Sequence, residues 1–195
     1  EVIDGLRILH NSGEEGCRVL NKVTEALALI RVHDPARYRQ VIRDLKRVWI
    51  MASPAYSACY HPNRSTCELN ERFVLNSATT AERIASSIVH EATHARLYGY
   101  GIGYVEKDRV RIEGICIRRE MAFARKLPEG TENWQQAETK LDNLPDLSDK
   151  AVGERNVAGL RAALLYLDAP KWLTNLIVSY QRWRYRRRSA RQKIN

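Results

Sequence analysis

Hydrophobic residues recur at two different spacings in the first third of the chain. Residues 2–10 hold a tight apolar cluster before the turn-like Asn11-Ser12-Gly13, and this pattern predicts a short strand. From residue 14 to about 31, apolar side chains recur every three or four positions, which predicts a helix. A second helix is expected to follow, with Asp34 as its cap and Pro35 at its first position.

The next segments combine β-like runs with turn residues. The helical spacing of apolar residues becomes irregular at residues 48–51. We interpret this segment as the end of the second helix or as a strand before the Ser53-Pro54 break. Residues 56–76 contain short β-like pieces, and the last of them, Arg72–Asn76, is predicted to be a strand.

Two longer helices are predicted in the middle of the chain. Thr79 and Glu82 match a capping box, so a helix is expected to begin there and to end at Gly99. After a Gly-rich loop, Asp108 is the expected cap of a second helix that runs to about Lys126.

The remaining sequence is helical in pattern. Three further helices are predicted at roughly 131–143, 149–167 and 170–190. The expected fold class is therefore α+β, with a small N-terminal sheet and a largely helical C-terminal half. We expect one domain over residues 1–169 and a basic helix or tail over residues 170–195 that packs on this domain at its start.

The charge is concentrated at the C-terminus. Residues 170–195 carry eight basic and no acidic side chains, which leaves +1 of the net +9 for the rest of the chain. Such a tail fits an anionic partner, either nucleic acid or an acidic membrane surface, or it is a solvated helix end. Its basic residues are Lys171, Arg182, Arg184, Arg186, Arg187, Arg188, Arg191 and Lys193.

The tail also carries an apolar stripe at helical spacing. We expect this stripe to pack on the body of the protein, with an anionic membrane surface as the alternative. Its members are Trp172, Leu173, Leu176, Ile177, Tyr180 and Trp183. No apolar run approaches the roughly 20 residues of a membrane span, and none is typical of a secretory signal, which favours a cytoplasmic location.

The cysteines give no metal-binding or redox motif of their own. The four cysteines form no Cys-x-x-Cys pair, which argues against a zinc ribbon or a thioredoxin-like site. Cys59 and Cys67 flank a turn-like segment, where a disulfide is the alternative to free thiols. Cys17 and Cys116 lie on predicted helices as small apolar residues, and this favours reduced thiols throughout.

The strongest chemical signal is His90-Glu91-Ala92-Thr93-His94 in the first of the two central helices. Histidines four residues apart lie on one helical face, and this pattern is typical of a catalytic zinc site. The carboxylate of Glu91, turned by about 100° from His90, can reach a zinc-bound water rather than the metal. We therefore predict one Zn²⁺ per chain and Glu91 as the general base.

A catalytic zinc needs a third protein ligand, and Glu113 is the best candidate. It follows His94 after 18 intervening residues, enough for the chain to turn and enter a neighbouring helix. Glu120 is the rival. It lies one heptad further along the same face, where it is expected to orient a ligand or to be an exposed carboxylate paired with arginines.

The motif and its downstream glutamate resemble the gluzincin family of zinc metallopeptidases. The resemblance covers roughly residues 72–124 and implies a zincin-like fold. It implies that His90, His94 and Glu113 hold zinc, that Glu91 is the general base, and that the strand at 72–76 pairs with an extended substrate. It thus implies a hydrolase that acts on peptide or protein substrates.

Two points stay open in the sequence. A developing oxyanion needs a donor besides zinc, and six side chains qualify: Tyr98, Tyr100, Tyr104, Tyr166, Arg111 and His61. The alternative function is a nucleic-acid- or membrane-binding protein that acts through the basic tail, with a structural or vestigial zinc site.

Overall fold

The chain divides into two compact units in the computed structural model, which describes residues 1–11, 13–52 and 56–192, with the side chains of 186–192 excepted. The first unit comprises Glu1–Met51 and Ser57–Leu144, and the second comprises Ala52–Tyr56 and Pro145–Asn195. The division therefore falls before the last two helices, whereas the sequence suggested residue 170.

Some sequence expectations fall on parts of the chain that are not described. They concern Ser12, the Ser53-Pro54 break, Lys193, and the side chains of Arg186, Arg187, Arg188 and Arg191.

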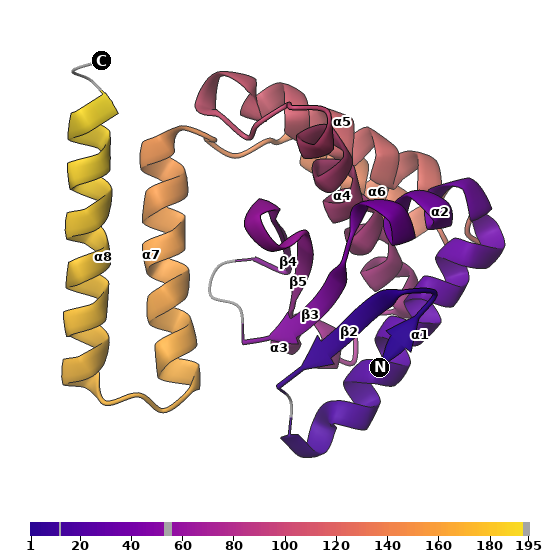
Figure 1. Ribbon diagram of the computed structural model, residues 1–195, viewed down its shortest axis with the longest axis horizontal. Coiled ribbons are helices and arrows are strands. Elements are labelled where there is room, and N and C mark those ends of the chain that lie inside the picture. Colours follow the sequence, from indigo (N-terminus) through magenta and orange to yellow (C-terminus); the bar gives the residue numbers. More distant parts are fainter. Residues whose placement is uncertain (12, 53–55, 193–195) are drawn as a thin grey trace. The chain divides into compact units, whose positions relative to one another are not determined.

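The first unit is built on a five-stranded mixed sheet (Figure 1). Its strand order is β1-β2-β3-β5-β4, in which β2, β3 and β5 are parallel and the two edge strands are antiparallel to their neighbours. The strands are β1 (Val2–Ile3), β2 (Leu6–His10), β3 (Arg47–Met51), β4 (Ala58–His61) and β5 (Thr66–Asn70). The expected α+β class is confirmed at this level, with a small N-terminal sheet and a helical C-terminal half.

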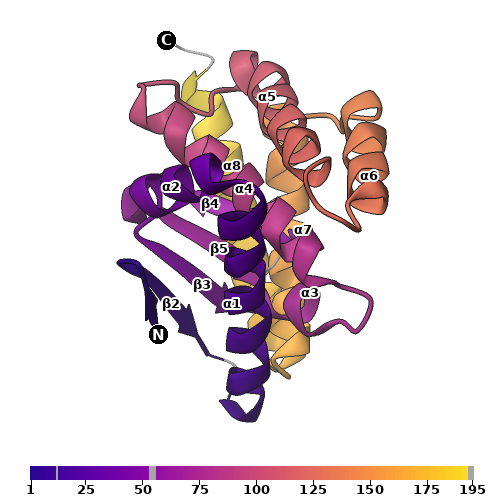
Figure 2. The same cartoon turned by 90° about the vertical axis from the view of Figure 1, so that its right-hand side faces the viewer.

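Helices α1 and α4 pack against each other and on the sheet (Figure 2). The core between them takes alternate residues of the strands, such as Val48 and Ile50, together with Ile84 and Ile88 of α4. The helices of this unit are α1 (Gly16–His33), α2 (Pro35–Asp44), α3 (Glu71–Leu75), α4 (Ala81–Gly99), α5 (Glu106–Ala124) and α6 (Thr131–Asp142); short 3-10 turns occupy Gly13–Glu15 and Pro62–Arg64.

The prediction of a strand at Arg72–Asn76 is wrong, because this segment forms helix α3. The side chain of Asn70 accepts a hydrogen bond from the Arg72 backbone N–H at 3.0 Å and so caps the helix. The antiparallel edge strand is instead β4, which pairs with β5 from Ala58↔Leu69 to His61↔Thr66. Local capping outweighed the β-like composition of the segment.

Helix starts were predicted to within a few residues. Asp34 caps α2 as expected, with its carboxylate accepting from the Arg37 N–H. The cap of α4 is Thr80 rather than Thr79, and its hydroxyl accepts from the Arg83 N–H at 3.3 Å. Helix α5 begins at Glu106, so Asp108 lies in its first turn instead of capping it.

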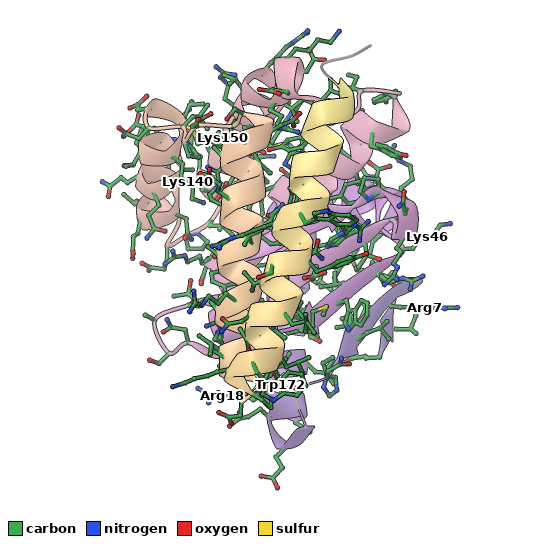
Figure 3. The ribbon with its side chains drawn as sticks, turned by 90° about the vertical axis from the view of Figure 1, so that its left-hand side faces the viewer. Arg7, Arg18, Lys46, Lys140, Lys150 and Trp172 are labelled. Carbon is green, nitrogen blue, oxygen red and sulfur yellow. The ribbon has the colours of Figure 1, made fainter. Side chains whose placement is uncertain are left out.

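The second unit is a helical hairpin of α7 (Asp149–Tyr166) and α8 (Lys171–Gln192). Figure 3 shows the two helices side by side, with Trp172 in the first turn of α8. Tyr185 of α8 connects the two helices, because its hydroxyl accepts a hydrogen bond from Asn156 of α7 and its ring fills the space that a Cβ atom at Gly153 would meet. Within the described residues, no helix has both the length and the apolar content needed to cross a membrane.

Candidate metal centre

Helices α4 and α5 bring the predicted site together. The Thr80 cap starts α4, and its apolar face, including Ile84 and Ile88, is buried in the core. Because residues four apart share a helical face, His90 and His94 lie one above the other, and they face α5, the helix that carries Glu113.

Facing atoms of three side chains lie at similar distances from one another. The Nε2 atoms of His90 and His94 are 3.2 Å apart, Glu113 Oε2 lies 3.3 Å from His90 Nε2, and Glu113 Oε1 lies 3.5 Å from His94 Nε2. Nitrogen ligands held about 2.0–2.1 Å from a tetrahedral zinc are about 3.3 Å apart by geometry. Spacing and donor types therefore fit a single metal ion.

Cys116 is a further candidate ligand that the sequence analysis missed. Its Sγ and one ring nitrogen from each of His90 and His94 all lie within 4.8 Å of one another. Cys116 follows Glu113 by one helical turn, and this spacing is the signal that could have found it. It is fully buried, and burial raises the pKa of its thiol.

Glu120 contacts the other ring nitrogen of His90. Its Oε2 lies 3.2 Å from His90 Nδ1, and its Oε1 accepts a hydrogen bond from Lys140 of α6 at 3.2 Å. Glu120 is only 5% exposed, so it is not the exposed helical carboxylate considered from sequence. A carboxylate on Nδ1 fixes the imidazole so that Nε2 points at His94 and Glu113. Nothing in the sequence pattern indicated Lys140.

Glu91 is buried between α4 and the edge strand β4. Its carboxylate accepts a hydrogen bond from the backbone N–H of Tyr60. Burial raises the pKa of Glu91 to about 7; the positive charge of His90 opposes this rise, and the negative charges of Glu113 and Glu120 add to it. A carboxyl group with a pKa near neutrality can both take and return a proton.

The charges in the cluster favour a single protonated histidine, His90, among the neighbouring carboxylates. Burial alone would lower the pKa of His90, but hydrogen bonds to Glu113 and Glu120 outweigh it and raise this pKa to about 10. Burial and the neighbouring charge of His90 lower the pKa of His94 to about 4. Burial opposes ionisation of Glu113, yet the two histidines and Tyr104 hold its pKa at about 2.

Tyr104 is the candidate oxyanion donor whose hydroxyl contacts the cluster. It donates a 2.5 Å hydrogen bond to Glu113 Oε1, and its ring meets the His94 ring edge-on at 5.4 Å. The guanidinium of Arg109 lies over the same ring, 5.4 Å from its centre. His61, another candidate, pairs with Glu68 on β5 at 2.8 Å.

The Cys59–Cys67 disulfide considered from sequence is not formed. Cys59 lies opposite Glu68 and Tyr60 lies opposite Cys67, so the two thiols project from opposite faces of the sheet. All four cysteines are free, as expected.

Comparison with known proteins gives no match: no family model fits the chain, and no curated protein or solved structure is significantly similar to it.

Proposed function

We propose that this protein is a zinc-dependent metallopeptidase with a zincin-like fold and a gluzincin-type ligand set of His90, His94 and Glu113. The observation that carries the proposal is the near-equal spacing of 3.2, 3.3 and 3.5 Å among their facing atoms. Three protein ligands leave a fourth position of a tetrahedral metal for water, as a hydrolytic site requires.

The residues around the cluster supply the remaining groups for peptide hydrolysis. A zinc ion bound there would lower the pKa of a bound water toward about 7 and polarise a carbonyl group. Glu91, which follows His90 directly and is buried beside the cluster, would take the proton of the attacking water and pass it to the leaving amine. The Tyr104 hydroxyl is the candidate donor for the developing oxyanion.

Strand β4 is the candidate binding edge for an extended substrate. It is the antiparallel edge strand, and the backbone N–H of its Tyr60 reaches Glu91. An edge strand can pair with an added peptide through main-chain hydrogen bonds. Such pairing would lay a peptide beside the proposed general base, which supports a peptide or protein as the substrate class.

The Glu91→Gln variant tests the mechanism. Purified wild-type protein should contain about one zinc per chain and should cleave a mixed library of quenched fluorescent peptides. Glu91→Gln should keep the zinc and lose cleavage by at least about a hundredfold, because the carboxamide cannot accept the proton. Glu129→Gln, an exposed carboxylate beyond α5, is the matched control. Equal cleavage by wild type and Glu91→Gln would refute this mechanism.

Cys116 supports a second candidate, a structural zinc site. If its thiolate joins His90, His94 and Glu113, four protein ligands close the tetrahedron and leave no position for water. Cobalt substitution separates the two readings. A strong thiolate-to-cobalt charge-transfer band that Cys116→Ser abolishes indicates the closed site, whereas identical spectra of both proteins indicate the open one.

A further inference from the structure

One face of helix α8 leaves a continuous row of apolar side chains exposed. Trp172, Leu176, Tyr180 and Trp183 follow each other at steps of four, four and three residues, so they form one stripe along the helix, which we call the α8 stripe. Their side chains are 69%, 61%, 55% and 47% exposed. The sequence analysis expected this stripe to pack on the body of the protein, with an anionic membrane surface as the alternative, and these four side chains are exposed.

The α8 stripe faces away from the partner helix of its own unit. Tyr185 marks the side of α8 that meets α7, because its hydroxyl accepts a hydrogen bond from Asn156 and its ring lies over the open side of Gly153. At 100° per residue, Trp183 and Leu176 lie on the opposite side of the helix from Tyr185. The hairpin thus buries one face of α8 and leaves the aromatic one open.

Basic side chains flank the α8 stripe. Arg182 and Arg184 are both exposed on either side of Trp183, and the Arg184 guanidinium lies 5.9 Å from the centre of the Tyr180 ring. Residues 170–195 hold eight basic and no acidic side chains in all. An apolar stripe with tryptophans, bordered by arginines, is the composition of a helix that lies in a membrane interface.

We infer that the α7–α8 hairpin binds an anionic membrane surface through the α8 stripe. The apolar row would enter the headgroup region while the flanking arginines meet lipid phosphates and carboxylates. Charge complementarity selects this occupant, since a second copy would bring another helix of the same positive sign against it. Leu176 lies in the middle of the row. Its aliphatic side chain makes no favourable contact with the phosphates through which a basic surface binds a nucleic acid. This inference does not depend on the proposed peptidase activity.

Vesicle sedimentation with the full chain tests this inference. The protein should sediment with vesicles of phosphatidylcholine and phosphatidylserine, and much less with phosphatidylcholine alone. The triple variant W172S/Y180S/W183S should bind the anionic vesicles at least about tenfold more weakly, because burial of three large aromatic side chains is lost. Val32→Ser, which removes a 68%-exposed apolar residue from α1, is the control and should bind as wild type does.

A second variant separates charge from apolar contact. R182E/R184E should also weaken binding to anionic vesicles by about tenfold or more, since two charges that attract anionic lipids are replaced by two that repel them. Circular dichroism of each variant verifies the helical content. Any of the following results would overturn the inference: no vesicle binding by wild type, binding that neither variant changes, or retention on DNA or RNA by the wild type and the serine variant alike without binding to vesicles. A dimer that the serine variant dissociates, without vesicle binding, would also overturn it.

Discussion

At the scale of single residues, His90 is held at both of its ring nitrogens. Nδ1 meets Glu120, and Nε2 faces His94 and Glu113. The Lys140 ammonium in turn holds the second oxygen of Glu120. This chain of contacts from α6 through α5 to α4 fixes the tautomer and the direction of the proposed ligand.

Glu120→Gln should weaken zinc binding without removing it. The carboxamide keeps an acceptor for the His90 Nδ1–H but loses the charge that makes the imidazole a stronger ligand, so we expect a loss of about tenfold in zinc affinity. Competition with a chromophoric chelator measures it, and Glu129→Gln is the exposed control. An affinity equal to wild type would show that Glu120 does not tune His90. A loss as large as that of His94→Ala would instead make Glu120 itself a zinc ligand.

The predictable part of the site is the part encoded by helical spacing. His90 and His94 share a face because they are four residues apart, and this follows from sequence alone. The contact between Glu113 and these histidines depends on how two helices pack, so it could be predicted only by assuming that packing. The roles of Cys116 and Lys140 depend on side-chain positions across the α4–α5 and α5–α6 contacts, which no periodicity in one sequence reveals.

At the scale of elements, Lys22 of α1 stabilises the segment that leads into α4, the helix with the candidate ligands His90 and His94. Its ammonium donates to the carbonyl oxygens of Val74, Asn76 and Thr79 at 2.9–3.0 Å. These oxygens belong to the end of α3 and to the segment that leads to the Thr80 cap. One side chain therefore satisfies three backbone acceptors between α3 and α4.

Lys22→Met should destabilise the first unit. The variant keeps the length of the side chain but leaves three carbonyl groups without their charged donor, and we expect a loss of about 1–3 kcal/mol in the free energy of unfolding. Urea denaturation followed by fluorescence measures it. Lys46→Met, at an exposed position in front of β3, is the matched control. If both variants unfold at the same urea concentration, the three contacts add nothing to stability.

The elements that the sequence predicted well have strong local signals. Helix α2 carries both the Asp34 cap and the Pro35 start, and the structure has both. The α3 segment failed as a prediction because its apolar residues suggest a strand, whereas the Asn70 cap selects a helix. The order β3-β5-β4 in the sheet could not be predicted, since strand order depends on long-range pairing rather than on local pattern.

At the scale of the whole molecule, the candidate metal centre and the α8 stripe belong to different compact units. His90, His94 and Glu113 all lie in the first unit, and α7 and α8 make up the helical hairpin of the second. A ligand that binds only the folded state stabilises the cooperative unit that contains its site. The two units should therefore respond differently to zinc.

Hydrogen exchange measured by peptide mass resolves this difference. At a free zinc concentration a hundredfold above its dissociation constant, the first unit gains about 2.7 kcal/mol, so amides in α4 and α5 that exchange through unfolding should slow by up to about a hundredfold. Amides of α7 and α8 should exchange at the same rate with zinc or with a chelator, and the zinc-treated His90→Ala variant should match the chelated protein throughout. Equal slowing in α7 and α8 would mean that the two units unfold as one. Loss of the metal would then also destabilise the hairpin that carries the α8 stripe.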